Sequence, residues 1–170
     1  MEDKPVAIVL GGTYPHKTLI NKLKKRGYST ILIDYYKNPP AKKAADLHIQ
    51  ESTLNKELVL EIAKRESVNL TIGLCIDQVL NTMAYVSEML KLPCHISYET
   101  AIALTNKNFM KDLFVANDIP TARHLKLERD NFKNVKKLNL PIVVKPADSN
   151  SSKGVQKITC YEQLESAYSM

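Results

Sequence analysis

Short apolar runs alternate with segments of helical spacing over the first hundred residues, and this alternation restricts the fold more than any other feature. Residues 6–10 form a continuous apolar run closed by two glycines, and residues 28–34 form a second β-rich run. Between them, residues 18–26 show helical spacing and end at Gly27, where a helix C-terminal glycine is expected. A strand, a helix and a second strand predict a βαβ unit with a right-handed crossover.

The same alternation continues to about residue 97. It predicts an α/β fold, an open parallel sheet with helices on both faces. We expect residues 6–10 to form the central strand, flanked in parallel by residues 29–34 and 70–75. The remaining elements expected here are short strands at residues 47–50 and 94–97, and helices at residues 55–66 and 78–90.

Strict alternation ends near residue 98, where the pattern becomes that of an α+β module. We place a domain boundary between about residues 98 and 105, which gives one domain of residues 1–100 and a second of residues 101–170. The elements expected after the boundary are helices at residues 98–104, 107–117 and 131–138, and strands at residues 121–127, 141–146 and 155–159.

The composition is that of a soluble globular protein, with 44% hydrophobic and 25% charged residues among 170. The longest apolar runs are far too short to span a bilayer, and the acidic, polar N-terminus is not a secretory signal. The cysteines Cys75, Cys94 and Cys160 fit no disulfide framework or metal motif, and two of them lie in or beside apolar runs, where cysteine acts as a small hydrophobic residue. We therefore expect a cytoplasmic protein with no membrane partner.

The net charge of +6 raises the question of nucleic-acid binding. The lysines are scattered over separate predicted helices, and the few aromatic residues do not interleave with them. This arrangement favours solvated helix faces over a nucleic-acid surface. An anionic small molecule is compatible with the positive charge.

A loop of Gly11, Gly12, Thr13 and Tyr14 lies between the first predicted strand and helix. In a parallel α/β sheet this is where ligands bind, at the carboxyl ends of strands and beside a helix N-terminus. The loop lacks the three spaced glycines of a dinucleotide fingerprint, so Asp34 is expected to be a strand-end residue in a turn rather than a ribose ligand. A tight turn and a small anion or substrate site explain the glycines about equally well.

A second loop follows the predicted strand at residues 141–146, and this strand has Lys145 near its end. Small polar residues follow from Ser149, and Gly154 closes the loop before the next apolar run. A strand, a loop of small residues and a strand can fold backbone N–H groups over a phosphate. A hairpin turn would explain the small residues alone, but Lys107, placed in a first helical turn where the helix dipole disfavours cations, adds a second candidate cation.

These residues resemble a known family. Residues 105–111, 117–121 and 141–155 look like the beginning of an ATP-grasp fold, closest to its carbamoyl-phosphate synthase-like and amino-acid ligase-like branches, and residues 1–100 look like the Rossmann-like pre-ATP-grasp domain that precedes it. The fold implied is a parallel-sheet pre-ATP-grasp domain followed by an incomplete α+β ATP-grasp subdomain. The ATP-binding residues implied by the resemblance are Lys107, Lys145, Ser149, Ser151, Ser152 and Gly154.

The resemblance implies the N-terminal part of a ligase that uses ATP to activate a small carboxylate as an acyl phosphate, which an amine or thiol-type nucleophile then attacks. It implies ATP and Mg²⁺ as cofactors, with the metal ligands and catalytic residues beyond residue 170, so we expect residues 1–170 to be inactive alone. The family often has a glycine at the position where this chain has Ser151. A non-catalytic nucleotide- or metabolite-binding module, a Rossmann oxidoreductase and a homodimer all stay open at this point.

Overall fold

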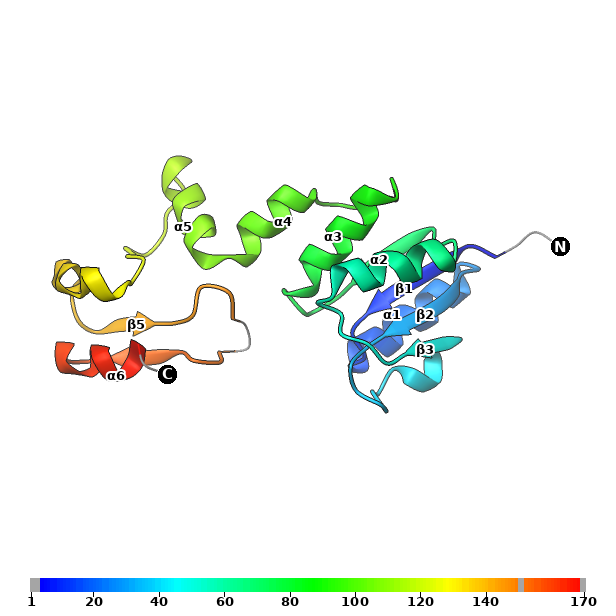
Figure 1. Cartoon of the computed structure of the whole chain (residues 1–170), viewed down its shortest axis with the longest axis horizontal. Helices are drawn as coiled ribbons and strands as arrows, with labels where there is room; N and C mark the ends of the chain where they lie inside the picture. Colours follow the sequence, from blue (N-terminus) through cyan, green and yellow to red (C-terminus); the bar gives the residue numbers. More distant parts are fainter. Residues whose placement is uncertain (1–3, 150–151, 169–170) are drawn as a thin grey trace. The chain divides into compact units, whose positions relative to one another are not determined.

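The computed structural model describes residues 4–149 and 152–168 of the chain (Figure 1). The chain divides into two compact units, Met1–Thr105 and Asn106–Met170. Each unit is described by itself. In the described ranges, no helix is long and apolar enough to cross a membrane.

The first unit is built on a parallel sheet of strand order β3-β2-β1-β4. The central strand β1 pairs in parallel with β2, where Ile8 lies opposite Ile31, and with β4, where Ile8 lies opposite Thr71. This confirms the predicted central strand and its two parallel neighbours. The strands are β1 (Val6–Leu10), β2 (Ser29–Ile33), β3 (Leu47–Ile49) and β4 (Leu70–Gly73).

Helices cover both faces of this sheet because successive strand residues point to opposite sides. Ile8 and Leu10 of β1 belong to a core that includes buried side chains of α2 and α3, whereas Ala7 and Val9 belong to the core on the α1 side. All four residues of β1 named here are fully buried. The helical elements are α1 (Tyr14–Lys25), η1 (Lys42–Ala44), α2 (Lys56–Arg65), α3 (Val79–Met89) and α4 (Tyr98–Thr105).

The first crossover is fixed by local signals. Gly27 adopts a φ of +88°, and its N–H donates to the carbonyl of Lys24 over 3.0 Å, so the predicted C-terminal glycine is confirmed. Asp46 then anchors the second strand, since one carboxylate oxygen accepts from both the N–H and the hydroxyl of buried Thr30, each over 2.9 Å. The other oxygen pairs with Lys24 over 2.7 Å.

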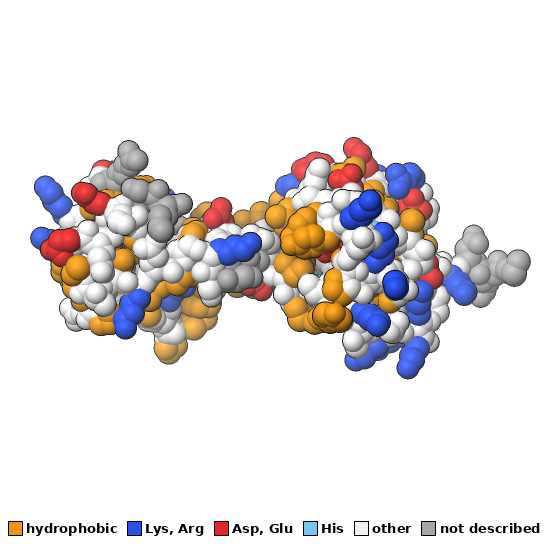
Figure 2. Space-filling model, turned by 90° about the horizontal axis from the view of Figure 1, so that it is seen from below, with side chains coloured by type: hydrophobic (Ala, Val, Ile, Leu, Met, Phe, Trp, Pro, Cys, Tyr) orange, Lys and Arg blue, Asp and Glu red, His pale blue; other side chains and the backbone are white. Residues whose placement is uncertain are grey.

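The basic side chains of the first unit are dispersed in separate spots among uncharged surface on the face seen in Figure 2. Cys75, Cys94 and Cys160 are all exposed, so the expectation that two of them act as small hydrophobic residues in or beside apolar runs is wrong. Cys75 follows β4 with a φ of +57°, which places it on the turn that leaves the sheet rather than inside the strand.

Residues 94–97 do not form the strand that was predicted. Ser97 is instead used to start α4, where its hydroxyl accepts from the N–H of Thr100 over 3.2 Å and its carbonyl accepts from Ala101 over 2.9 Å. A cap of this kind satisfies N–H groups at the first turn of a helix. A four-residue segment with only two apolar side chains, Cys94 and Ile96, was therefore too weak a signal for a strand.

The second unit contains a short antiparallel hairpin of β5 and β6, in which Ile142 lies opposite Ile158. Val135, Ile158 and Leu164 are its buried core side chains. The elements are α5 (Lys107–Ala116), η2 (Arg129–Lys137), β5 (Ile142–Val144), β6 (Gln156–Ile158), η3 (Tyr161–Gln163) and α6 (Leu164–Tyr168).

Two predictions for this unit were wrong. Residues 121–127 do not form a strand, because in the described structure no strand pairs with them. Side-chain bonds hold the segment instead: the Lys111 ammonium donates to the Thr121 hydroxyl, and the Arg123 guanidinium donates to the Lys137 carbonyl over 3.1 Å. Residues 131–138 fall mainly within the 3₁₀ segment η2 rather than an α-helix.

Candidate functional site

Lys107 is the first residue of α5 in the second unit. The side chain of Asn106 caps this helix by accepting from the N–H groups of Asn108 over 3.0 Å and Phe109 over 3.3 Å. The backbone N–H of Lys107 is thereby left to donate outside the helix, to the carbonyl of Ala147 over 2.8 Å. The capped helix start thus holds Lys107 directly against the loop that follows β5.

The side chain of Lys107 reaches the same loop. Its ammonium donates to the Ser149 carbonyl and, over 3.5 Å, to the Ala147 carbonyl. These oxygens satisfy a cation that lies at the positive end of a helix, where cations are otherwise disfavoured. Lys107 and Ser149, two of the residues singled out in the sequence, are therefore in direct contact.

Lys145 follows β5 by one residue and is exposed. Its ammonium forms no hydrogen bond or ion pair with any other part of the chain that the structure describes. A free ammonium at a strand end is ready to bind an anion, and it is also what a lysine that extends into water would show. The geometry is compatible with both interpretations.

The last residues of the loop after β5 lie close to its first residues, just beyond the end of that strand. Gly154 has a φ of +69°, and a Cβ atom at this position would come within 2.9 Å of the Pro146 Cγ atom, so glycine is required for the close approach. Ser152 also has a positive φ, +58°. Ser151 lies outside the described residues.

Lys111, one helical turn after Lys107, is a cation to which the sequence interpretation gave no role. Its ammonium donates to the Thr121 hydroxyl and to the Ala122 carbonyl over 3.4 Å. The spacing of four residues could have indicated that it shares a helix face with Lys107. It secures the chain after α5 rather than the loop after β5.

In the first unit, residues 11–14 form the loop between β1 and α1, which is called the glycine loop below. It follows the end of β1 and is bonded to the end of β2. Gly11 adopts a φ of +102°, and its N–H donates to the Ile33 carbonyl over 2.9 Å. A Cβ atom on Gly12 would come within 2.3 Å of Pro39 Cβ and 2.9 Å of Asp34 Oδ2. Both glycines are therefore needed for the backbone to lie against neighbouring groups.

His16 lies fully buried in the first turn of α1. Its Nδ1 atom accepts from the Thr13 N–H over 3.2 Å and lies 2.7 Å from the Thr13 hydroxyl oxygen, so the neutral ring carries its proton on Nε2. Burial lowers the His16 pKa below 6.5, and the nearby charge of Asp34 opposes this shift without outweighing it. His16 therefore positions Thr13 at the helix start as a neutral group.

Two other N–H groups of the loop have no acceptor among the described residues, one on buried Gly12 and one on exposed Tyr14. Both lie at the N-terminus of α1, where the helix dipole favours an anion. The arrangement can hold a small anionic group, whereas no group of three or more His, Cys, Asp or Glu side chains in residues 4–149 and 152–168 is arranged to hold a metal ion.

Asp34 is confirmed as a strand-end turn residue, because its Oδ1 atom accepts from the Tyr36 N–H over 2.8 Å. It is nearly buried, and its other oxygen faces Gly12. The sequence interpretation gave no role to Tyr35 and Tyr36, which follow it and are more than half exposed. Two adjacent tyrosines in a Pro-containing loop after a strand were a usable signal for a surface site.

The chain was compared with known proteins. Residues 113–170 match the sequence model of the family described as "D-ala D-ala ligase C-terminus". A D-alanine–D-alanine ligase of Polynucleobacter asymbioticus is 35% identical over 92 residues, which are 52% of this chain and 27% of that enzyme. The chain thus spans only about a quarter of the length of this relative.

Two solved structures are similar over nearly the whole chain. N5-carboxyaminoimidazole synthetase from Staphylococcus aureus, complexed with ADP, has a TM-score of 0.76 and 16% identity, over 99% of this chain and 45% of that one. L-amino acid ligase from Bacillus licheniformis has a TM-score of 0.71 and 21% identity, over 98% of this chain and 40% of that one. The chain therefore has the fold of the N-terminal part of an ATP-grasp ligase, a Rossmann-like parallel-sheet unit followed by the first α+β elements of the ATP-grasp domain.

Proposed function

We propose that the chain is part of an ATP-dependent ligase that joins a carboxylate to an amine or thiol-type nucleophile, in the manner of the carbamoyl-phosphate synthase-like branch. Residues 1–100 would be the pre-ATP-grasp domain and residues 101–170 the beginning of the ATP-grasp domain. The observation that carries the proposal is the direct bonding of Lys107 to the loop after β5, at Ala147 and Ser149.

The chemistry that this fold supports has two steps. A carboxylate oxygen attacks the γ-phosphorus of ATP, the bond to the β-phosphate oxygen breaks, and ADP leaves. The nucleophile then attacks the acyl carbon, and inorganic phosphate leaves. Phosphoryl transfer of this kind depends chiefly on positioning and on neutralising charge.

Lys145 is the residue of this chain best placed to supply such neutralisation, since its ammonium, at the end of β5, has no partner among the described residues. Lys107 would contribute a second positive charge after exchanging loop carbonyls for phosphate oxygens. The positive φ angles of Ser152 and Gly154 turn the backbone beside them. Turns of this kind can direct N–H groups at a phosphate.

The described residues do not fit Mg²⁺, which prefers several oxygen ligands in octahedral geometry, because they contain no cluster of acidic side chains that could hold a metal. We therefore assign no residue of this chain to the metal. Its ligands would come from other parts of the protein.

The glycine loop of the first unit would bind the anionic group of the small substrate. The N–H groups of Gly12 and Tyr14, which have no acceptor in the described part of the chain, and the dipole of α1 support this assignment. Three free cysteines also suit a reducing cytoplasm, where we propose that the enzyme works.

Release of ADP and phosphate tests the proposal. The complete reading frame that contains these residues should release both from ATP when a suitable pair of amino acids, or an amino acid and another carboxylate, is present. Residues 1–170 alone should not sustain turnover. ATP binding without ADP release across such a panel would favour a non-catalytic binding module.

A further inference from the structure

Two helices of this chain begin with the same pair of residues, an asparagine that caps the helix and a lysine that is its first residue. Asn55 and Lys56 begin α2 in the first unit, and Asn106 and Lys107 begin α5 in the second. In both, the asparagine side chain accepts hydrogen bonds from backbone N–H groups of the first turn. The two helix starts can therefore be compared with the local sequence held constant.

At α2, the lysine is bound within the first unit and serves packing. The Lys56 N–H donates to the Leu54 carbonyl, two residues earlier, over 3.1 Å. The Lys56 ammonium donates to the Tyr98 hydroxyl over 2.6 Å and lies 4.5 Å from the centre of the Tyr85 ring. An ammonium over an aromatic ring is attracted to its π-electrons. Lys56 thus joins α2 to α3 and α4, the helices that carry the two tyrosines.

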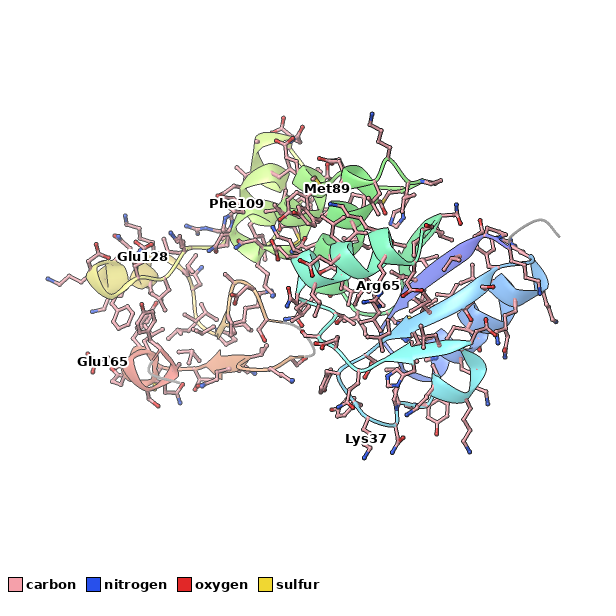
Figure 3. All side chains as sticks on the ribbon, turned by 45° about the vertical axis from the view of Figure 1, so that its right-hand side comes forward. Lys37, Arg65, Met89, Phe109, Glu128 and Glu165 are labelled. Atoms are coloured by element: carbon pink, nitrogen blue, oxygen red, sulfur yellow. The ribbon has the colours of Figure 1, made fainter. Side chains whose placement is uncertain are left out.

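At α5, Asn106 binds the backbone of the whole first turn. Its side-chain oxygen accepts from the N–H groups of Asn108 over 3.0 Å and Phe109 over 3.3 Å, and its carbonyl accepts from Met110 over 2.9 Å. Phe109 is labelled in Figure 3 on this first turn of α5. Three consecutive N–H groups therefore end on Asn106, which fixes the direction of the helix start.

The N–H group that precedes these three belongs to Lys107 and bonds outside the helix. It donates to the Ala147 carbonyl over 2.8 Å, and the Lys107 ammonium donates to the carbonyls of Ala147 and Ser149. All four N–H groups at the start of α5 thus have acceptors in the protein. The helix start therefore offers a phosphate the Lys107 side chain rather than backbone N–H groups, and Asn106 determines where that side chain begins.

We propose that Asn106 is a positioning residue of the ATP site, which holds Lys107 against the residues after β5 and acts on ATP through that lysine. The inference rests on the proposed binding of ATP phosphates by Lys107. The Asn106 side chain is committed to backbone N–H groups and needs no contact with the nucleotide. Its effect comes from geometry, because a shift of about 1 Å in a group that binds the substrate can cost orders of magnitude in rate.

The first test is the KM for ATP, measured by ADP release from the complete protein. Asn106→Ala should raise it roughly fivefold, the equivalent of about 1 kcal/mol and the usual cost of losing a cap. Asn106→Ser keeps an acceptor at the cap and should restore the KM. Asn55→Ala removes the same kind of cap from α2 and is the matched control. It should leave the KM unchanged, because a merely structural loss lowers the amount of folded enzyme and hence the apparent kcat.

The second test asks whether the effect passes through Lys107. In protein that already carries Lys107→Met, Asn106→Ala should raise the KM no further, since two residues that act through one interaction are not additive. A rise as large as in the unaltered protein would overturn the inference, as would an equal rise with Asn55→Ala or none with Asn106→Ala.

Amide exchange separates this inference from the proposed function. In residues 1–170, Asn106→Ala should reduce the protection of the Lys107 N–H from exchange, and Asn55→Ala should not. Unchanged protection would overturn the positioning role alone. Reduced protection, without ADP release by the complete protein or with an unchanged KM in Lys107→Met, would instead overturn the proposed ATP site and this inference with it.

Discussion

The backbone N–H of Lys107 donates to the carbonyl oxygen of Ala147 over 2.8 Å, which joins the first residue of α5 to the loop after β5. The ammonium group of Lys107 also donates to this loop, at the carbonyls of Ala147 and Ser149. A lysine proposed to bind ATP thus donates to the protein's own carbonyls. The same bonds hold the proposed phosphate loop at the helix start.

Removing this ammonium should loosen the loop. We expect Lys107→Met to speed trypsin cleavage after Lys153 by roughly fivefold, because a net hydrogen bond stabilises by about 1 kcal/mol and cleavage follows local opening. Lys111→Met is the matched control, since Lys111 bonds Thr121 rather than the loop. Peptide mapping of timed digests measures the rates. Equal acceleration by both substitutions would show that the effect is not local to Lys107.

A methyl group on Gly12 should displace the loop that carries the tyrosines. Gly12→Ala would place its Cβ 2.3 Å from Pro39 Cβ, so we expect a loss of about 1–3 kcal/mol of unfolding free energy and of amide-exchange protection at Ala41. Gly27→Ala is the control, because its Cβ would meet nothing within 4 Å and only the φ of +88° is strained. It should cost about 1–2 kcal/mol without affecting Ala41. Retained protection at Ala41 in Gly12→Ala would contradict the steric account.

The Asp46 carboxylate should contribute to the unfolding free energy of the first unit. Burial raises its pKa, but hydrogen bonds from Lys24 and Thr30 outweigh this and lower it overall. Asp46→Ala leaves the N–H and hydroxyl of buried Thr30 without their acceptor, and should cost about 1–3 kcal/mol in urea unfolding. Asp46→Asn keeps an acceptor for Thr30 and loses mainly the exposed ion pair, so it should cost less than about 1 kcal/mol. Equal losses would mean that the charge, not the acceptor, is what matters.

The buried His16 predicts how stability depends on pH. Its pKa is lower in the folded state than the 6.5 of the unfolded chain, so the unfolded state binds more protons once the pH falls below about 6.5. His16 should therefore contribute its full stability above that pH and lose it as the pH falls toward its folded pKa, by up to about 1.4 kcal/mol per pH unit. Denaturant unfolding measured at about pH 5, 6, 7 and 8, on both sides of the ordinary histidine pKa, tests this. His16→Asn should reduce the slope, while His95→Asn, an exposed control, should leave it; equal slopes in all three would refute the assignment.

The parts of the fold that could be predicted are those in which local pattern and long-range packing agree. The run at residues 6–10 is apolar on both faces, as a central parallel strand must be, and Gly27 supplies the backbone angle that its turn requires. Residues 121–127 alternate as a strand does, but no strand lies beside them in the described structure. The alternation itself does not show whether a partner strand exists. Their position is set instead by contacts to Lys111 and Lys137.

The candidate sites, too, could be predicted from the sequence only in part. Glycines that must lie close to other atoms, such as Gly12 and Gly154, can be recognised as loop residues, but the atoms they approach are visible only after folding. The contact between Lys107 and Ser149 joins residues 42 positions apart, so no local pattern could reveal it. The exposure of Tyr35 and Tyr36 likewise depends on where their loop is held.

The most direct measurement of the central claim is the steady-state rate of ATP-dependent ADP release by the complete protein carrying Lys145→Ala. If the Lys145 ammonium neutralises a transferring phosphate, kcat/KM for ATP should fall roughly a hundredfold or more, at about 1.4 kcal/mol per tenfold. Lys133→Ala, an exposed lysine on η2, should leave it unchanged. Equal and small effects of the two substitutions would contradict the ATP site and make Lys145 a lysine that simply ends a strand.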